Sequence, residues 1–537
     1  MNILGIHGGV TVNQHDAGAA LVVDGKLVCF VEEERLIRVK TATGTLPVES
    51  ISACLRESHL TIYDIDLICL SGETYEDIIL RTEEWLKHHF GHAPKIIKIN
   101  HHTAHLASAF YQSRYEQAMC LSVDAYGDGL SGAIAIGDSK AGLNVIETIP
   151  ALNSLGVFYS TITSFLGFRP GEDEYKVMGL APYGSPVIDL SFFCKPIPEG
   201  FYCDPKYFRS RRSATAYEPY YSQALIDKIG NPRRKDEPIH DKYKNIAASA
   251  QNALESCLIS LVTKIFNQTG QKNLCLAGGV ALNCSANRLL SALPFIDNFF
   301  VQPAASDRGL PLGCALHAAF LYGEKIQPIS HVFYGPTYSL KEIESALNIT
   351  GVKAIKIENP AEEASKKIAD GQIVGWYQGR SEFGPRALGH RSILANPSIA
   401  NMKDQINKKV KFREEFRPFA PAVLEEDCFE IFEMKAPSPY MTIAHDIKSP
   451  WNLKMPATTH INNTGRVQTV DEKSDPLFYS LIKDVKSKTS CPAVLNTSFN
   501  IKGQPIVEKP IEAISTFFGT GLDAMFIENY MITKTQS

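Results

Sequence analysis

A pattern of three strands separated by two distinctive turns occurs twice in the first 150 residues. Strands are expected at residues 3–6, 19–23 and 27–31 in the first copy, and at 119–123, 133–136 and 143–149 in the second. The first turn of each copy is acidic, with His15-Asp16 in one and Asp124 in the other, and a tight turn of aspartate and glycine joins the last two strands. Asp-Gly between apolar runs is a strong hairpin signal. The repetition predicts a duplicated α/β fold in which two acidic turns face one cleft.

Actin-like and sugar-kinase-like ATPases have such a duplicated fold. Two unrelated β-meanders would give the same order of strands and are the alternative. The chain has 537 residues, too many for one core, because domains usually hold about 100–200 residues. Apolar spacing predicts a helix at 245–266, and residues 185–234 are expected to form an exposed insertion. A connector is expected at 328–350, followed by a second α/β unit that begins near Val352.

Composition excludes several classes of protein. The net charge of −4 does not favour a general nucleic-acid or membrane-surface role. The 12 cysteines form no CxxC pair, so a structural zinc site has little support, and Cys275, Cys284 and Cys314 are expected to be small buried core residues. Neither a secretory signal nor an apolar run of about 18 residues is recognisable, so a cytoplasmic protein without a membrane partner is expected.

A histidine-rich segment suggests a metal site. His101 and His105 are four residues apart, so on a helix they lie on one face, about one turn from each other. Asp124 and Asp307 each enter a glycine-containing turn and are candidate carboxylate ligands. Two imidazoles and two carboxylates suit iron or another divalent first-row metal. Histidines that only cap a helix or form hydrogen bonds in a polar loop are the alternative.

Glycine-rich turns suggest a nucleotide cleft. An expected strand at 274–276 runs into Gly278, Gly279 and Asn283, where backbone N–H groups could approach a phosphate at a helix N-terminus. With Gly127 of the acidic turn, these are the candidate nucleotide-binding residues of the first domain. Residues 306–313 form a similar turn, and the sequence contains no GxxxxGK[ST] or GxGxxG string.

Cations and amides gather in four segments of the second α/β unit. Residues 379–391 contain three arginines, residues 411–418 add three more cations, and Arg466 and residues 495–500 add another arginine with amide and hydroxyl donors. Clustered guanidinium groups bind oxyanions in a bidentate manner, which predicts a phosphate site. A solvated basic face is the alternative, but the residues between the charges are apolar. No nucleophile elbow, Cys–His pair or HExxH string predicts covalent catalysis.

Several motifs then identify a family that the chain resembles. They are HDA at 15–17, EEER at 32–35, HHTAH at 101–105, YKVMGLAPYG at 175–184, GGVALN at 278–283, GPRALG at 384–389, FRPFAP at 416–421 and NTSFN at 496–500. These motifs cover nearly the whole chain in order and resemble the NodU/CmcH family of O-carbamoyltransferases, which act on antibiotics, nodulation factors and related natural products.

The resemblance implies a TsaD-like domain at 1–350, of the duplicated actin-like (ASKHA) fold, and a YrdC-like α/β domain at 351–537. The second would form carbamoyl-adenylate from carbamoyl phosphate and ATP, with Mg²⁺ for the ATP. The first would transfer the carbamoyl group to a hydroxyl, or less often an amine, of a small natural-product or sugar acceptor near a bound metal, often iron. A homodimer is compatible with the resemblance.

The resemblance also assigns roles to individual residues. The metal ligands would be His101, His105, Asp124 and Asp307. His15 and Lys40 match positions near the acceptor and the carbamoyl group. The adenylate-forming pocket would contain Arg386, Lys411, Arg417, Arg466, Asn496 and Ser498.

The chain departs from the family pattern at a few positions, such as Phe383, where tryptophan is common, and Gln504, where glutamate is frequent. The loop 8–14 is also unusual and lies beside His15, so the acceptor stays open. Two other functions remain: threonylcarbamoyl-type transfer to tRNA, which the acidic net charge disfavours, and a non-catalytic nucleotide-binding scaffold. ATP turnover that depends on carbamoyl phosphate would separate the three.

Overall fold

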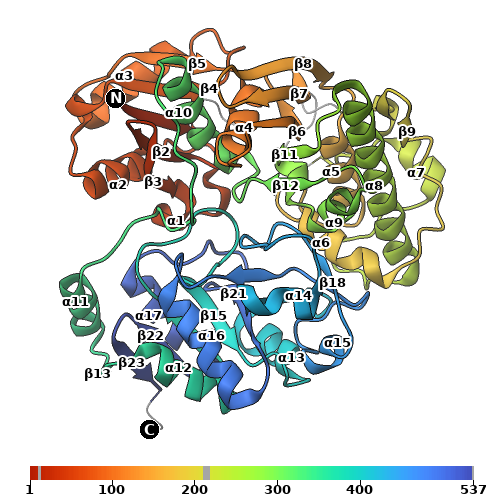
Figure 1. Ribbon diagram of the computed structural model, residues 1–537. Helices are drawn as coiled ribbons and strands as arrows, with labels where there is room; N and C mark the ends of the chain where they lie inside the picture. The colour runs from red at the N-terminus through yellow and green to blue at the C-terminus, as the bar shows by residue number, and fades with distance from the viewer. Residues whose placement is uncertain (10–13, 210–217, 535–537) are drawn as a thin grey trace. The chain divides into compact units, whose positions relative to one another are not determined.

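The computed structural model describes residues 1–9, 14–209 and 218–534, and the chain divides into two compact units (Figure 1). The first unit contains Met1–His7, Val22–Lys26 and Ile65–Pro328. The second contains Gly8–Leu21, Leu27–Asp64 and Ile329–Ser537. Two early segments of the chain therefore group with its C-terminal half. The functional division into 1–350 and 351–537 stays a prediction.

Two five-stranded sheets share one strand order. The first has the order β3-β2-β1-β4-β5 and the second, read from its far edge, the order β8-β7-β6-β11-β12. In both sheets, three strands that are consecutive in sequence lie side by side. The next strand then pairs in parallel with the first of the three, β4 with β1 and β11 with β6, and one more strand pairs in parallel with it at the edge. The strands are β1 Asn2–His7, β2 Gly18–Val23, β3 Lys26–Glu32, β4 Leu67–Ser71, β5 Ile96–Ile99, β6 Gln117–Gly127, β7 Leu130–Asp138, β8 Gly142–Pro150, β11 Asn273–Ala277 and β12 Asn298–Val301. The predicted α/β fold with a duplicated sheet is confirmed.

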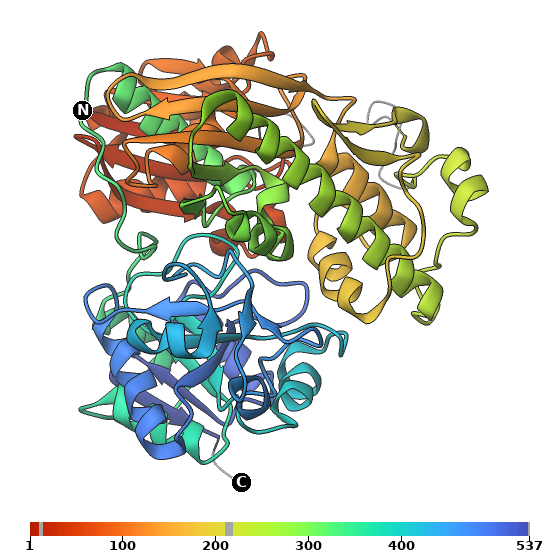
Figure 2. The same cartoon turned by 45° about the vertical axis from the view of Figure 1, so that its right-hand side comes forward.

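Helices of the first unit position the turns at the ends of these strands. They are α3 Ile78–Phe90, α4 His101–Phe110, α5 Leu155–Phe165, α6 Glu174–Leu180, α7 Gln223–Ile229, α8 Asp241–Thr269, α9 Cys284–Ala292 and α10 Leu310–Leu321. The predicted helix at 245–266 is α8, the long green helix of Figure 2. It ends where Gly270 adopts a left-handed conformation, which favours glycine. The predicted insertion at 185–234 carries a small hairpin, β9 Cys194–Ile197 and β10 Gly200–Cys203.

Helices α4 and α10 approach each other closely because α10 has a glycine at the contact. A Cβ atom on Gly313 would lie 1.8 Å from the carbonyl oxygen of Ala104. Gly5 of β1 allows a similar approach to the backbone of Pro311 on α10. These two glycines fix α4, which carries the histidine pair, against the core.

An eight-stranded mixed sheet forms the centre of the second unit, in the order β13-β23-β22-β14-β15-β21-β16-β20. A separate three-stranded sheet has the order β17-β18-β19. The bounds are β13 Ile355–Lys356, β14 Val374–Tyr377, β15 Arg391–Ala395, β16 Ala420–Leu424, β17 Phe432–Glu433, β18 His445–Ile447, β19 Thr464–Gly465, β20 Gln468–Val470, β21 Ala493–Ser498, β22 Ala524–Ile527 and β23 Tyr530–Thr533. The helices are α1 Glu33–Ile37, α2 Val48–Ser58, α11 Leu340–Thr350, α12 Pro360–Ala369, α13 Met402–Ile406, α14 Cys428–Ile431, α15 Trp451–Lys454, α16 Pro476–Thr489 and α17 Pro510–Phe518.

Both faces of the central sheet are buried. Side chains of β14 alternate between two cores: Trp376 packs with apolar residues of α12 and α16, whereas Tyr377 packs with those of α11, α13 and α17. A strand buried on both faces reads as a continuous apolar run, as residues 373–377 do. This layered arrangement confirms the expected second α/β unit.

All twelve cysteines are buried and free, so the prediction for Cys275, Cys284 and Cys314 is confirmed. Within the part of the chain that the structure describes, no helix combines the length and the apolar character needed to cross a membrane.

Candidate functional site

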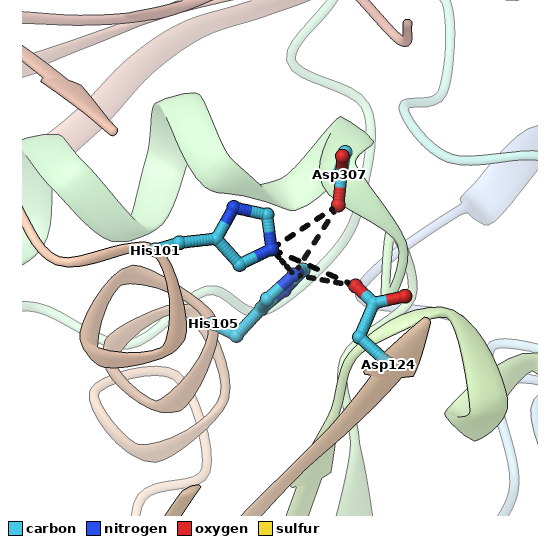
Figure 3. Close-up of side chains that lie close together, drawn as sticks. All are labelled: His101, His105, Asp124 and Asp307. Carbon is cyan, nitrogen blue, oxygen red and sulfur yellow. Dashed lines mark hydrogen bonds and ion pairs between the residues drawn. The ribbon is translucent and has the colours of Figure 1, made fainter. Parts of the chain in front are cut away.

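Four side chains of the first unit converge at one point (Figure 3). His101 and His105 come from successive turns of α4, Asp124 from the end of β6, and Asp307 from the 3-10 turn that precedes α10. Their ligand atoms all lie within 4.8 Å of one another. The Nε2 atom of His105 is 3.0 Å from Asp124 Oδ2 and 3.4 Å from Asp307 Oδ1, and that of His101 is 3.7 and 3.6 Å from the same two oxygens.

Local structure explains why these side chains meet. The side chain of Asn100 caps α4 by accepting hydrogen bonds from the N–H groups of His102 and Thr103. Asp128 accepts a hydrogen bond from the His101 N–H, 2.8 Å away, and so fixes the first residue of the helix. The pairing of β6 with β7 shifts register between Val123 and Gly127, which takes Asp124 out of the regular ladder.

The charges of the cluster are strongly coupled. Burial opposes a charge on His105, but hydrogen bonds and the negative charges of Asp124 and Asp307 raise its pKa to about 9. Burial acts against the charged form of Asp124 as well, yet the two histidines hold the pKa of this carboxyl well below its usual range. The Nε2 atoms of His101 and His105 are only 3.2 Å apart, so two neutral acceptors would repel unless a cation lies near both.

This donor set fits a metal ion. Two imidazole nitrogens and two carboxylate oxygens are ligands that iron, manganese and zinc accept, and no thiolate is among them. Asp124 Oδ2 is buried and faces both imidazoles, 3.0 Å from His105 Nε2 and 3.7 Å from His101 Nε2. A cation at the centre of the cluster would satisfy this oxygen.

The third histidine of the motif has another role. His102 points away from the cluster, with its Nδ1 atom 2.9 Å from Ser122 Oγ. Burial, helped by the charge of His101, lowers its pKa to about 3, so it is neutral. Sequence reasoning missed His7, whose Nε2 atom lies 3.8 Å from Asp307 Oδ2 and whose Nδ1 atom lies 2.9 Å from Ser71 Oγ. Its place at the end of the first predicted strand was the only signal for it.

The candidate glycines surround the metal cluster. A Cβ atom on Gly127 would lie 2.1 Å from Cδ2 of His101, so the absence of a side chain makes room for that ring. Gly278 has a φ of +89°, and its Cβ would lie 2.2 Å from the Val123 carbonyl oxygen. A Cβ on Gly279 would lie 3.0 Å from Asp124 Oδ1. Gly278 and Gly279 therefore bring one turn close to β6, and Gly127 leaves room for the His101 ring; a nucleotide-binding role for these glycines stays a prediction.

Asn283 is held by hydrogen bonds inside the first unit. Its Oδ1 atom caps α9 by accepting from the Ala286 N–H, and its amide exchanges hydrogen bonds with Gln251 of α8. This explains locally why an amide follows the glycine-rich turn. A contact between Asn283 and a nucleotide stays a prediction.

In the second unit, Lys411 lies among oxygen acceptors. Its ammonium group donates to the Ser498 carbonyl, at a short distance, and to Asn500 Oδ1 at 2.8 Å. Burial, with the positive charges of Arg413 and Arg417, lowers the pKa of Lys411 well below its ordinary value. Two predicted pocket residues, Lys411 and Ser498, are thus direct neighbours.

The other predicted pocket residues are more varied in their surroundings. Asn496 is buried on β21 and donates to the Ala387 carbonyl and to Gln468 Oε1, whereas its own Oδ1 accepts no hydrogen bond in the described residues. Arg386, Arg417 and Arg466 are partly buried. Asn496 therefore connects β21 directly to the loop that carries Arg386.

Two arginines that the sequence placed with the phosphate cluster have structural roles instead. Arg391 is fully buried, stacks 3.6 Å from the Tyr377 ring centre, and donates to the backbone carbonyls of Gln378 and Gly379. Arg380 donates to three backbone carbonyls, those of Val28, Tyr334 and Gly335. Spacing alone could not reveal this, because an arginine bound to carbonyls and one bound to phosphate look alike in a sequence.

His15 and Lys40, the predicted transfer residues, both lie in the second unit. They are partly exposed, and His15 Nδ1 is 3.5 Å from Asp16 Oδ2. The N–H of Asp16 donates to the Thr41 carbonyl at 2.5 Å, which joins the two segments. Residues 10–13 of the unusual loop lie outside the described residues.

Family models match both halves of the chain. A family model described as carbamoyltransferase N-terminus matches residues 3–90 and 69–316, and one described as carbamoyltransferase C-terminus matches residues 365–534. The matches together span most of the chain, including all four candidate metal ligands and all the candidate pocket residues.

Curated relatives cover nearly the full length. "Uncharacterized protein sll1178" of Synechocystis is 33% identical over 98% of this chain and 96% of its own. "Nodulation protein NolNO" of Sinorhizobium fredii is 37% identical over 97% of this chain and 79% of its own. "Nodulation protein NolO" of Bradyrhizobium diazoefficiens is 38% identical over 81% and 79%.

Proposed function

Because this chain belongs to the carbamoyltransferase family, we propose that it is an ATP-dependent O-carbamoyltransferase that proceeds through carbamoyl-adenylate. The second unit would form the adenylate from carbamoyl phosphate, ATP and one water: hydrolysis of carbamoyl phosphate gives carbamate and phosphate, and a carbamate oxygen then attacks the α-phosphorus of ATP and displaces pyrophosphate. The carbamoyl group would then pass to a hydroxyl of a small natural-product or sugar acceptor in the cytoplasm. The observation that carries the proposal is the cation and amide cluster around Lys411 on a chain that matches both halves of the family.

Activation needs a site that neutralises several negative oxygens at once. Arg386, Arg417 and Arg466 are partly buried, so their guanidinium groups keep a surface that can bind phosphate oxygens. Lys411 is held by fixed acceptors, the Ser498 carbonyl and Asn500 Oδ1, and adds to the positive charge of this cluster. Cations fixed before substrate binds stabilise the charge that develops at the transferring phosphorus without reorganisation of solvent.

Transfer needs a polarised carbonyl group and a base. A divalent metal, held by His101, His105, Asp124 and Asp307, would act as a Lewis acid that polarises a carbonyl oxygen. His15 is partly exposed beside the Asp16 carboxylate, which orients the ring and stabilises its protonated form, so it can take the proton of the acceptor hydroxyl. Lys40, at the start of the neighbouring 3-10 turn, supplies a positive charge for the carbamoyl oxygen.

The test is pyrophosphate release from ATP and Mg²⁺, with and without carbamoyl phosphate, and with no acceptor added. Release that requires carbamoyl phosphate is expected. Arg417→Ala should lower the rate at least about 100-fold, as expected when a preorganised charge at a reacting phosphoryl group is lost. Arg56→Ala is the matched control, because Arg56 is an exposed arginine of the same unit whose side chain pairs with Glu57.

Each outcome has a defined meaning. Release without carbamoyl phosphate, or with a different acyl donor only, would replace the proposal by another acyl transfer, such as the threonylcarbamoyl type. Binding of ATP without release under any condition would favour a nucleotide-binding scaffold.

A further inference from the structure

Residues 32–35 form hydrogen bonds with the loop that carries Arg386, and both segments belong to the second unit. The Gly384 N–H donates to Glu32 Oε1 at 2.6 Å, and Arg35 donates to the Gly384 carbonyl at 2.6 Å. Arg35 and Glu32 are themselves paired, with 2.9 Å between Nε and Oε2. The two backbone groups of one loop residue are therefore held by one ion pair.

This contact is buried, which makes it directional and strong. Glu32 and Arg35 are each 2% exposed. Charge-assisted hydrogen bonds are about twice as strong as neutral ones, and removing one partner of a buried ion pair leaves an uncompensated charge. The rings of Phe30 and Phe383 lie 4.7 Å apart beside it and keep water away.

The other end of the loop is fixed by a second carboxylate. Glu382, 1% exposed, accepts hydrogen bonds at one oxygen, Oε1, from the N–H groups of Leu388, His390 and Arg391 at 2.7, 3.3 and 3.2 Å. Arg386 lies two residues after Gly384 and two before Leu388. The backbone of this arginine is thus suspended between two fixed points, and neither contact uses the Arg386 side chain.

We propose that Glu32 and Arg35 are positioning residues for adenylate formation: they hold the 384–388 loop so that Arg386 faces the oxyanion of the substrate. The inference rests on the proposed function for the role of Arg386, but the grip on Gly384 is independent of it. Their neighbours in the EEER motif face other partners: Glu33 accepts hydrogen bonds from Ser50 of α2, and Glu34 accepts one from the Thr41 N–H. The hydrogen bonds to Gly384 come from Glu32 and Arg35.

Hydrogen–deuterium exchange of the full chain tests the grip without any activity. In Glu32→Gln and Arg35→Lys, amides in peptides that cover residues 382–391 should exchange at least about tenfold faster than in the wild type. Glu33→Gln is the matched control: the same change one residue away should leave these peptides unchanged and affect those at 48–52. A folded Glu32→Gln or Arg35→Lys protein with wild-type exchange at 382–391 would overturn the proposal.

A double-mutant cycle tests how the grip acts in catalysis. Arg35→Lys should lower kcat/KM for carbamoyl phosphate in pyrophosphate release at least about tenfold, and Arg386→Ala should lower it further. In the Arg386→Ala background, Arg35→Lys should add less than about twofold, because both act through one group. Effects that multiply independently would show that Arg35 only supports folding and would contradict a positioning role.

The two arms also separate this inference from the proposed function. If the wild type releases no pyrophosphate, the adenylate mechanism fails. The exchange arm then still decides whether Glu32 and Arg35 hold the loop.

Discussion

Replacing Gly127 by alanine should remove one ligand from the metal cluster without touching a ligand residue. The new Cβ would lie 2.1 Å from Cδ2, 2.3 Å from Cγ and 2.5 Å from Nε2 of His101. Ordinary contact begins at 3.4 Å, so the ring must retreat by the difference, 3.4 minus 2.1, or about 1.3 Å. A metal–nitrogen bond is about 2.0–2.1 Å long and does not tolerate that displacement.

Loss of one of four ligands should weaken metal binding at least as much as disturbing an outer-shell partner, which costs 10–100-fold. We expect about 100-fold weaker binding, which corresponds to about 2.8 kcal/mol at 1.4 kcal/mol per tenfold. The measurement is calorimetric titration of the metal-free protein with Mn²⁺. Overpacking should also lower stability by about 1–3 kcal/mol.

Gly129→Ala is the matched control in the same turn. A Cβ there meets nothing within 4 Å, but the φ of +81° strains any residue except glycine. This variant should lose stability and keep its affinity for Mn²⁺. Wild-type affinity in Gly127→Ala would refute the reasoning, since it would mean that His101 is not a ligand or that its ring is free to move. Adding His101→Ala to Gly127→Ala should cause little further loss of Mn²⁺ affinity if both changes act on the bond between His101 and the metal.

Three further predictions concern stability. Arg391→Ala should lower the free energy of unfolding in urea at pH 8 by about 3–5 kcal/mol, because it removes a fully buried guanidinium that donates to backbone carbonyls and lies 3.7 Å from Glu508, whose pKa burial raises to about 7; a loss below about 1 kcal/mol would contradict this. Gly313→Ala should lower the unfolding free energy by about 3 kcal/mol, because its Cβ would lie 1.8 Å from the Ala104 carbonyl oxygen; unchanged thermal stability would argue against the close packing of α4 on α10. The free energy of unfolding of the metal-free protein should fall by up to about 3 kcal/mol between pH 6.5 and 9. The pKa of His105 is raised to about 9 in the folded protein, so the stabilisation from its charge is complete only below the pKa of about 6.5 in the unfolded chain and is lost as the pH rises through 9. An unfolding free energy that does not change with pH in the metal-free protein, or that changes equally with Mn²⁺ bound, would refute this.

The fold could be predicted largely because its signals are local. The strands are short apolar runs ended by Asp-Gly turns, and α8 shows the helical period, so both copies of the sheet follow from neighbouring residues. The grouping of Leu27–Asp64 with the C-terminal half could not be predicted. It depends on contacts such as Arg35 with Gly384, which are 349 residues apart and leave no periodic trace in the sequence.

The convergence of His101, His105, Asp124 and Asp307 could also be predicted from the sequence, for a related reason, whereas the bound metal stays a prediction. The i, i+4 spacing of His101 and His105 defines a helical face, and Asp124 ends a strand of the repeated pattern. Asp128 was not singled out, because its function is to accept the N–H of His101 and that of Thr74, and backbone donors are invisible in a sequence. Position within a local pattern could be predicted, but the partner of a side chain could not.

The three arginines at 380–391 show why the residue type alone does not predict which side chains bind phosphate. Guanidinium groups bind carbonyl oxygens as well as phosphate oxygens, and burial decides between the two. Arg391 is fully buried and donates to backbone carbonyls, and Arg380 donates from Nε and Nη2 to three backbone carbonyls, so both guanidinium groups hold the protein backbone. Arg386 lies between these two on a loop held at both ends by carboxylates that face the backbone. The structural arginines therefore build the loop, and Arg386 is the one arginine of this segment for which we propose contact with substrate.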